Sequence, residues 1–310
     1  MNIARLGIHE SVDEVFPPAR LRDALSDLEP EVVVVESDRA DLERCDAVVT
    51  LEHVAAFVET VAWIHTIQAG YDRFPLAAFE DHGIVLTNSA GIHGTSVGET
   101  VTGYMLMLAR GLHRHAKRQP TRRWEQPAWD DAFTLEDESV CVVGLGTLGR
   151  GIVDRAAALG MHVTGVRKSG EPVTGVDRVY RSEELHDAIA EPTFVVLATP
   201  LNEETRRLIG PAELEMMRDD AYLLNVSRGE VVDEGALVAA LRNDELAGAA
   251  LDVFETEPLP EDSPLWEMDD VIVTPHCAAF TRDYYRDVAA LVRENVERHR
   301  NGKPMKNRVL

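Results

Sequence analysis

The sequence contains only three cysteines, Cys45, Cys141 and Cys277, in 310 residues. They form no CxxC pair and have no matching histidine spacing, which argues against a zinc site or a disulfide scaffold. We therefore predict reduced thiols and no metal site.

The chain also lacks a run of 18 apolar residues and a charged start that leads into an apolar stretch. Neither a membrane span nor a secretory signal is indicated, and we expect a cytoplasmic protein.

Lysine is also scarce. Only four of the 31 basic residues are lysines, namely Lys117, Lys168, Lys303 and Lys306. The 54 acidic residues give the chain a formal net charge of −23, which argues against a nucleic-acid partner. Salt near the molar range shortens the screening length to about 3 Å and removes most of the repulsion between such carboxylates. The scarcity of lysine beside abundant arginine therefore favours a halophilic host over the alternative, an ordinary acidic protein.

Strand-like and helix-like runs alternate along the chain, which is typical of α/β domains. The first group of predicted strands comprises residues 2–8, 31–36, 46–50, 63–68 and 83–87. The second group comprises residues 139–144, 161–166, 177–180, 194–198, 221–226, 248–253 and 271–274. Several of these runs are almost continuously apolar, as strands buried on both faces of a parallel sheet must be. The two groups predict two separate domains, each with its own sheet.

Two longer helical patterns frame the second group of strands. Residues 95–114 predict one long helix that enters the second domain. The basic and aromatic segment from His113 to Trp129 then predicts either a dimer arm or an ordinary surface loop. A last helical run, residues 282–300, follows the final strand. It could cross back to complete the first domain, which would make that domain discontinuous in sequence.

A glycine motif of the form GxGxxG lies where a predicted strand gives way to a helix. Gly144 allows a tight turn, Gly146 lets the backbone approach a pyrophosphate, and Gly149 lets the helix pack closely on the strand. The phosphate would lie at the N-terminus of the helix. An isolated motif of this kind carries little weight, but the strand before it, the helix after it and the βα units downstream support it. The motif predicts a domain that binds NAD or NADP.

Three later segments follow the order and spacing of the D-2-hydroxyacid dehydrogenase family: residues 225–233 (NVSRGEVVD), 251–258 (LDVFETEP) and 273–276 (VTPH). The segment 263–266 (SPLW) fits the same pattern, so the chain resembles this family over nearly its whole length. The resemblance implies two Rossmann-like, doubly wound parallel-sheet α/β domains with an interdomain cleft. Residues 1–95 plus 283–310 would form the substrate-binding (catalytic) domain, and residues 96–282 the dinucleotide-binding domain.

The resemblance implies that Arg228, Glu257 and His276 are catalytic, and their chemistry suits the reduction of a 2-keto acid. A guanidinium fork such as that of Arg228 pairs with a carboxylate through two charge-assisted hydrogen bonds and can polarise the keto oxygen. His276 can donate a proton in reduction and take it back in oxidation. Glu257 would orient His276 and favour its imidazolium form. The alternatives are a surface ion pair, a capping or core histidine and a solvated carboxylate, but the three residues together favour catalysis.

The family also implies contacts to the substrate and to the cofactor. Ala69 and Gly70 resemble the loop that holds the substrate carboxylate alongside Arg228 and His276, although a plain turn would have the same sequence. Asp252 would orient the nicotinamide carboxamide, or alternatively cap the turn after its strand. The residues that the family implies for cofactor binding at the glycine turn and after the later strands are Gly144, Gly146, Thr147, Leu148, Gly149, Thr199, Pro200, Val226, Asp252 and Ala278.

The choice of cofactor depends on the end of the strand at residues 161–166. An NAD enzyme usually carries an acidic residue there, about 20 residues beyond the glycines, where it binds the ribose 2′-hydroxyl. Here Arg167 occupies that position and is followed by Lys168 and Ser169. These three residues would attract the 2′-phosphate of NADP, so we predict that NADP(H) is preferred and that NAD(H) is possible. The alternative is that Arg167 and Lys168 are only solvated charges after a strand.

We therefore predict an NAD(P)-dependent D-2-hydroxyacid dehydrogenase that reduces 2-keto acids to D-2-hydroxy acids with NADPH. The resemblance also implies a homodimer formed through the cofactor domain. One alternative is a glyoxylate/hydroxypyruvate reductase, which shares every motif above. Another, of a different class, is a nucleotide-sensing corepressor that retains the three catalytic residues but turns over slowly.

Overall fold

The computed structural model describes residues 3–310, so Asn2 of the first predicted strand lies outside the described residues. Contacts divide the chain into two units. Unit 1 is formed by the chain up to Ile92 together with Phe280–Leu310, and unit 2 by His93–Ala279. The boundaries expected from the sequence, 95/96 and 282/283, lie a few residues further along the chain.

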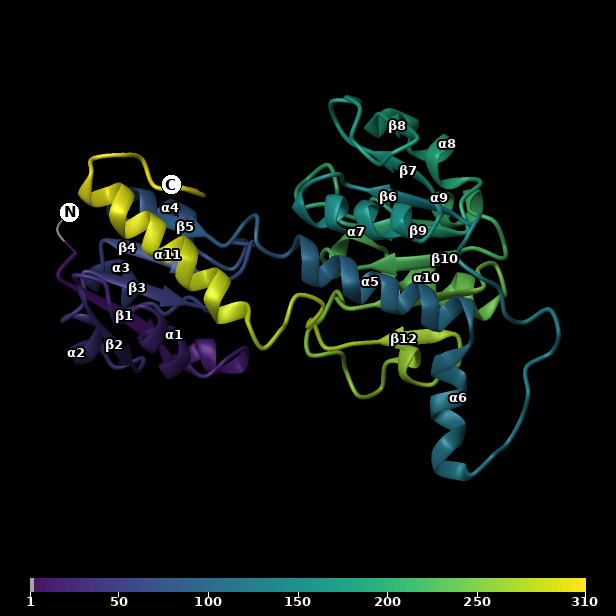
Figure 1. Cartoon of the computed structure of the whole chain (residues 1–310), viewed down its shortest axis with the longest axis horizontal. Helices are drawn as coiled ribbons and strands as arrows, with labels where there is room; N and C mark the ends of the chain where they lie inside the picture. Colours follow the sequence, from purple (N-terminus) through teal and green to yellow (C-terminus); the bar gives the residue numbers. More distant parts are fainter. Residues whose placement is uncertain (1–2) are drawn as a thin grey trace. The chain divides into compact units, whose positions relative to one another are not determined.

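Unit 1 is built on a parallel sheet with the strand order β2-β1-β3-β4-β5 (Figure 1). Each of the five strands forms within one of the predicted runs or beside it. The strands are β1 (Arg5–His9), β2 (Glu31–Val35), β3 (Ala47–Thr50), β4 (Trp63–Thr66) and β5 (Val85–Asn88). Every neighbouring pair is parallel. The carboxyl ends of the five strands therefore share one edge of the sheet.

Helices cover both faces of this sheet, because successive side chains of a strand point to opposite sides. Val49 and Trp63 pack with α1 (Pro18–Ala24) and α11 (Tyr284–Arg300). Val48 and Ile64 pack on the opposite face with residues of α2 (Arg39–Leu42), α3 (Phe57–Thr60) and α4 (Leu76–Asp81). A short helix, η1 (Glu10–Glu14), connects β1 to the segment before α1. The last helix of the chain, α11, thus completes the unit that begins at the N-terminus.

Unit 2 contains a parallel sheet with the order β12-β11-β10-β9-β6-β7-β8. Its strands are β6 (Ser139–Val143), β7 (His162–Val166), β8 (Arg178–Tyr180), β9 (Phe194–Leu197), β10 (Tyr222–Asn225), β11 (Gly248–Leu251) and β12 (Val271–Val273). All of them lie within predicted strand runs. The two parallel α/β sheets confirm the predicted fold class.

The helices of unit 2 lie on both faces of its sheet. One face packs against α5 (Gly94–Ala109) and α7 (Thr147–Ala158). The other packs against α8 (Leu185–Ile189), α9 (Pro211–Met216) and α10 (Glu234–Arg242). Short 3₁₀ helices fill several connections: η2 (Gln119–Thr121), η3 (Ser182–Glu184), η4 (Gly229–Val231) and η5 (Pro264–Trp266). Within residues 3–310, no helix has both the length and the apolar character that a membrane span needs.

The single long helix predicted for residues 95–114 is wrong. The helix α5 ends at Ala109, and Gly111 adopts a left-handed φ of 60° before a second helix, α6 (Leu112–Arg118), begins. Glycine adopts this conformation without the steric cost that a Cβ brings, so the chain can change direction here while the apolar spacing continues. The basic and aromatic segment is therefore helical in its first part.

Candidate active site

The strand order of unit 2 reverses beside β6, which places a ligand site at the carboxyl ends of β6 and β9. From β6 the chain proceeds to β7 and β8 on one side, and then returns to place β9 on the other side. Ligands of open α/β sheets bind at such a reversal, because the loops that leave the two central strands diverge there. The glycine turn follows β6, and Thr199 and Pro200 follow β9.

The glycine turn has the geometry that the sequence predicts. Gly144 has a φ of 102°, and a Cβ on it would lie 2.6 Å from the carbonyl oxygen of Ala198. A Cβ on Gly149 would lie 1.9 Å from the carbonyl oxygen of Gly144, so only glycine lets α7 approach this closely. A Cβ on Gly146, in contrast, would meet nothing within 4 Å. The space beside Gly146 is therefore open to a ligand, and the turn fits the pyrophosphate of a dinucleotide.

Thr147 and Leu148 form the first turn of α7, which has no side-chain cap. The backbone N–H groups of such a turn have no acceptor within the helix and can bind phosphate oxygens. The hydroxyl oxygen of Thr199 is buried and has no hydrogen-bond partner among residues 3–310. A buried polar atom without a partner is costly, and a bound ligand at this edge would provide one. Pro200 uses its carbonyl oxygen to accept a hydrogen bond of 2.6 Å from the Thr205 hydroxyl.

Arg167, Lys168 and Ser169 directly follow β7. The Arg167 side chain is 28% exposed and lies 3.9 Å from the Glu171 carboxylate. Lys168 is 78% exposed and pairs with Glu204 at 2.8 Å. The Ser169 hydroxyl accepts a hydrogen bond from the backbone N–H of Glu171. Exposed ion pairs of this kind are weak, so the two cations can turn toward a stronger anion, although the Lys168 pair also fits the alternative of a solvated charge.

Arg228 lies in the loop after β10, and the side chain of Asn225 shapes that loop. The buried Asn225 amide donates to the carbonyl oxygen of Arg228 at 2.9 Å, and its oxygen accepts from the N–H of Ser227 at 3.0 Å. Gly229 packs directly on the next loop, since a Cβ there would lie 1.8 Å from the carbonyl carbon of Phe254. The Arg228 guanidinium donates to the carbonyl oxygen of Ser227 at 2.8 Å. Asn225 was not among the predicted site residues, although a polar residue at the end of an apolar strand was a visible signal.

His276 follows β12 in a left-handed conformation, with a φ of 49°. Its Nδ1 lies 2.8 Å from Oε2 of Glu257, and both side chains are 27% exposed. The other oxygen of Glu257 accepts from the N–H of Phe254 at 3.2 Å, which fixes the carboxylate in the loop after β11. Because a carboxylate only accepts, Nδ1 of His276 donates to it, and Nε2 is the ring nitrogen left for a substrate. The pair thus has the geometry of a general acid with an orienting group.

Asp252 holds the loop that carries His276. One of its oxygens accepts from the Thr274 hydroxyl at 2.6 Å and from the N–H of Cys277 at 2.9 Å. The other accepts from the N–H of Ala278 at 2.9 Å. Burial raises the pKa of the Asp252 carboxyl, while these three hydrogen bonds oppose that effect. The contacts favour the capping alternative, whereas the role toward a nicotinamide carboxamide stays a prediction.

The remaining site residues of unit 2 belong to its core. Val226 and Ala278 are buried after β10 and β12 respectively. The Ala278 carbonyl accepts from the Thr100 hydroxyl of α5 at 2.9 Å. Tyr104 of the same helix lies 2.6 Å from the Thr274 hydroxyl oxygen. The helix α5 therefore supports the histidine loop, a role that was not predicted from the sequence.

Ala69 and Gly70 lie in unit 1, after the carboxyl end of β4. The carbonyl oxygen of Ala69 accepts a hydrogen bond of 2.7 Å from the side-chain amide of Asn88, the last residue of the neighbouring strand β5. This contact fixes the loop, and its role toward a substrate carboxylate stays a prediction.

Cys45, Cys141 and Cys277 are free, and residues 3–310 contain no cluster of three or more metal-binding side chains.

The chain is similar to known proteins over its whole length. The family model "D-isomer specific 2-hydroxyacid dehydrogenase, NAD binding domain" matches residues 102–278. Glyoxylate/hydroxypyruvate reductase B of Yersinia pestis is 33% identical over 235 residues, which cover 74% of this chain and 72% of that protein.

Two solved structures superpose closely. A D-isomer specific 2-hydroxyacid dehydrogenase family protein from Aeromonas salmonicida has a TM-score of 0.85 at 29% identity, covering 99% of both chains. A D-isomer specific 2-hydroxyacid dehydrogenase from Xanthobacter autotrophicus, in complex with NADPH and MES, has a TM-score of 0.83 at 30% identity. That match covers 100% of this chain and 98% of the other. The chain belongs to the D-isomer specific 2-hydroxyacid dehydrogenase family.

Proposed function

We propose that the protein reduces small 2-keto acids to D-2-hydroxy acids and prefers NADPH to NADH. Membership in the family makes it a nicotinamide-dependent oxidoreductase that acts on CH–OH groups. The observation that carries the proposal is the pair of His276 and Glu257, whose Nδ1 and Oε2 atoms lie 2.8 Å apart. This pair follows strands β12 and β11, and Arg228 follows the neighbouring strand β10.

Arg228 binds and orients the substrate in this proposal. Its planar guanidinium forms two parallel hydrogen bonds to a carboxylate, which fixes the keto acid more precisely than a point charge would. The same cation draws electron density toward the keto oxygen and makes the carbonyl carbon more electrophilic. Asn225 keeps the Arg228 backbone in place through its bond to the Arg228 carbonyl oxygen. The backbone N–H groups of Ala69 and Gly70 in unit 1 are likewise proposed, from the family resemblance, to bind a substrate carboxylate.

His276 supplies the proton. With Nδ1 directed at Glu257, an Nε2–H group donates to the keto oxygen as that oxygen gains negative charge. The carboxylate of Glu257 stabilises the protonated ring before the transfer and keeps it oriented afterwards. In the reverse direction, neutral Nε2 accepts the proton of the hydroxy acid. When bound, the reduced nicotinamide supplies the hydride that the carbonyl carbon receives.

The preference for NADPH rests on the residues after β7. Arg167 occupies the position at which an NAD enzyme usually carries a carboxylate for the ribose 2′-hydroxyl. Arg167 and Lys168 offer positive charge, and Ser169 offers a hydroxyl. The Xanthobacter protein was solved with NADPH bound. These observations together favour NADP(H), with NAD(H) as a weaker alternative.

We expect Arg167→Asp to reverse this preference. The new carboxylate would repel the 2′-phosphate of NADPH and accept a hydrogen bond from the ribose of NADH. Loss of a charge-assisted contact costs about 1.5–3 kcal/mol, so kcat/KM for NADPH should fall by about 10- to 100-fold. Arg242→Asp, on α10 of the same unit, makes the same charge change and should leave the ratio unaltered. Equal NADPH and NADH kinetics before and after Arg167→Asp would contradict the assignment.

The substrate class is tested by a steady-state survey. Glyoxylate, hydroxypyruvate and pyruvate are compared with both reduced cofactors, in low salt and in molar salt, by the absorbance of the reduced nicotinamide. The likeness to the Yersinia reductase favours glyoxylate and hydroxypyruvate.

The net charge of −23 favours higher activity in molar salt, as expected for a halophilic protein. NADPH binding without oxidation by any of the three acids would instead support the corepressor alternative. The cytoplasmic location stays a prediction.

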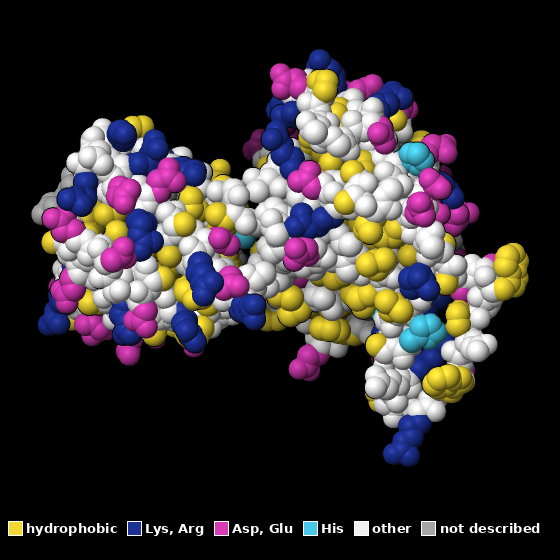
Figure 2. Space-filling model, in the orientation of Figure 1, with side chains coloured by type: hydrophobic (Ala, Val, Ile, Leu, Met, Phe, Trp, Pro, Cys, Tyr) yellow, Lys and Arg dark blue, Asp and Glu magenta, His cyan; other side chains and the backbone are white. Residues whose placement is uncertain are grey.

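We also propose that the protein is a homodimer through the segment from α6 to Trp129. Trp124 is 94% exposed and Trp129 is 93% exposed. Figure 2 shows hydrophobic side chains, in yellow, on the surface around α6. Large aromatic side chains contribute heavily to interfaces, because each can bury about 150–250 Å² of surface. Arg114 and Lys117 anchor α6 to the segment directly before β12 through ion pairs with Asp270 and Asp269.

The double variant Trp124→Ala/Trp129→Ala should dissociate the dimer. The double variant removes four tryptophans from the dimer, two from each protomer, so a contribution of about 1 kcal/mol from each would raise the dimer dissociation constant by about a thousandfold. Sedimentation velocity of the wild type should give twice the chain mass of 34.3 kDa, and the double variant should give the monomer at the same concentration. Met216→Ala removes a hydrophobic side chain that is 44% exposed elsewhere in unit 2 and should leave the dimer intact. A wild-type monomer would refute the proposal.

A further inference from the structure

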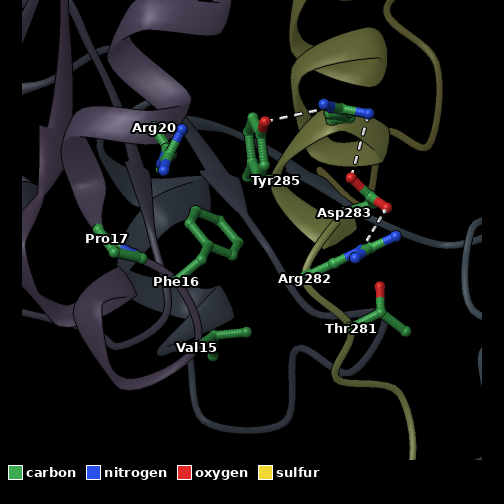
Figure 3. Close-up of a pocket in the computed structure, with 9 residues that line it drawn as sticks. Val15, Phe16, Pro17, Arg20, Thr281, Arg282, Asp283 and Tyr285 are labelled. Carbon is green, nitrogen blue, oxygen red and sulfur yellow. Dashed lines mark hydrogen bonds and ion pairs between the residues drawn. The ribbon is translucent and has the colours of Figure 1, made fainter.

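A cavity of about 510 Å³ lies within unit 1, between the segment before α1 and the start of α11 (Figure 3). No residue used in the proposed reaction lines it. One wall is formed by residues 15–17 and Arg20 of α1, and the other by Thr281, Arg282 and Asp283 with the first turn of α11. The second wall begins five residues after His276, so it is joined to the histidine loop through a short stretch of backbone.

The charge of this cavity is opposite to that of the protein. Its lining contains three guanidinium groups, from Arg20, Arg282 and Arg286, and one carboxylate, from Asp283. The whole chain, in contrast, has a formal charge of −23. The next carboxyl along α11 is that of Asp287, whose pKa is raised by burial and by the neighbouring Asp283. The cavity is therefore a local concentration of positive charge in an acidic protein.

Asp283 leaves most of this positive charge uncompensated. Its carboxylate lies 3.1 Å from the Arg286 guanidinium and 3.5 Å from that of Arg282. The Arg282 side chain is 95% exposed, so its pair with Asp283 is weak. Arg20 has no side-chain hydrogen bond or ion pair with any residue of the described part of the chain, residues 3–310. Two of the three guanidinium groups can therefore bind an external anion.

Aromatic rings form the apolar part of the cavity. The ring centroids of Phe16 and Tyr285 lie 6.3 Å apart, and Phe16 also packs edge-on against Tyr284 at 5.7 Å. The Tyr285 hydroxyl accepts from Arg286 at 3.1 Å, which fixes the ring. Figure 3 shows the rings of Phe16 and Tyr285 between Arg20 and Arg282 in this view. A ligand with one charged end and a flat apolar body matches this arrangement.

We propose that this cavity is a second anion site, which binds a small molecule carrying a carboxylate or phosphate group. Arg20 and Arg282 lie on opposite walls of the cavity, and the guanidinium fork of either one holds the anionic group, because such forks match the geometry of both oxyanions. Phe16 and Tyr285 pack against the apolar body of the ligand. The site uses residues of unit 1 alone and does not depend on the proposed reaction.

Isothermal titration calorimetry of the full-length protein tests this site. Benzoate and inorganic phosphate are titrated separately at constant ionic strength, with saturating NADP⁺ present and in the Arg228→Gln background. These conditions keep both anions from the proposed cofactor and substrate sites. We expect saturable binding of at least one anion, and the tighter one identifies carboxylate or phosphate as the preferred group. Binding of neither anion would overturn the proposal.

The arginines are tested by paired variants. The double variant Arg20→Gln/Arg282→Gln should lower the affinity for the anion by at least about tenfold, because charge-assisted hydrogen bonds are lost. Arg22→Gln/Arg39→Gln removes the same charge from elsewhere in unit 1 and should leave the affinity unchanged. The single variant Arg282→Gln alters a side chain that is 95% exposed, so it tests the site even if the double variant is unstable. Unchanged affinity in both pocket variants would place the anion elsewhere. Calorimetry measures binding without turnover, so this result is separate from any failure of the proposed function.

Discussion

His276→Asn should lower kcat by about 10²- to 10⁴-fold, the range that general acid–base catalysis contributes. Asparagine retains a polar amide of similar reach, but it cannot deliver a proton to the keto oxygen. Binding of NADPH should be unchanged, since the glycine turn lies at β6 and not in the histidine loop. Stopped-flow measurement of reduced-cofactor absorbance separates hydride transfer from product release. His162→Asn, at an exposed position on β7, is the matched control and should retain wild-type turnover.

Glu257 variants test whether the carboxylate acts through His276. Glu257→Gln keeps an oxygen that can accept from Nδ1, which lies 2.8 Å from Oε2, and keeps an acceptor for the Phe254 N–H. Glu257→Ala removes both. We expect kcat to decrease in the order wild type, Glu257→Gln, Glu257→Ala, while the double variant with His276→Asn is no slower than His276→Asn alone. A full additional loss in that double variant would show that Glu257 acts independently of the histidine.

Arg228→Gln should lower kcat/KM for the keto acid by about a thousandfold or more. The variant loses both the carboxylate clamp and the cation that polarises the keto oxygen, and each charge-assisted contact contributes about 1.5–3 kcal/mol. Arg228→Lys keeps the charge but loses the planar fork, so it should recover only part of the activity. If Arg228 also polarises the keto oxygen, kcat should fall together with the rise in KM.

The control for Arg228 must separate catalysis from folding. Asn225 and Gly229 hold the backbone of this loop, so substitution of the Arg228 side chain should leave the melting temperature close to that of the wild type. Arg242→Gln on α10 makes the same charge change away from the loop and should be kinetically silent. Wild-type kcat/KM in Arg228→Gln would exclude Arg228 from the reaction.

Much of the fold was predictable, because local physical requirements determine it. The inner strands β3, β4, β9 and β11 are buried along their whole length, as strands covered on two faces must be, whereas the edge strands β2 and β8 are partly exposed. The predicted runs overlap all of the strands β1 to β12. The glycine turn was predictable for the same reason, since no other residue fits at Gly144 or Gly149. The break at Gly111 was missed because the apolar spacing of a helix continues across it, and one left-handed residue changes direction without altering that spacing.

The candidate site was predictable only in part. Arg228, Glu257 and His276 were identified by motif, and the pairing of His276 with Glu257 is present in the structure. Asn225 and Asp252 were harder to interpret, because a buried polar side chain has a role only through the groups that face it. Asp252 accepts three hydrogen bonds from residues 22 to 26 positions away, all within the histidine loop. No local pattern in the sequence encodes such a contact.

The sequence by itself determined the alternation of strands and helices, the nucleotide-binding turn and the family, since these depend on residue type and on spacing along the chain. The tertiary structure alone decided which polar groups meet. Strand order places the loops after β10, β11 and β12 at one edge of a sheet. The packing of α1 and α11 in one core gathers Arg20 and Arg282 around one cavity from opposite ends of the chain. The reason is physical: hydrogen bonds and ion pairs act over a few ångströms in space, whatever the distance in sequence.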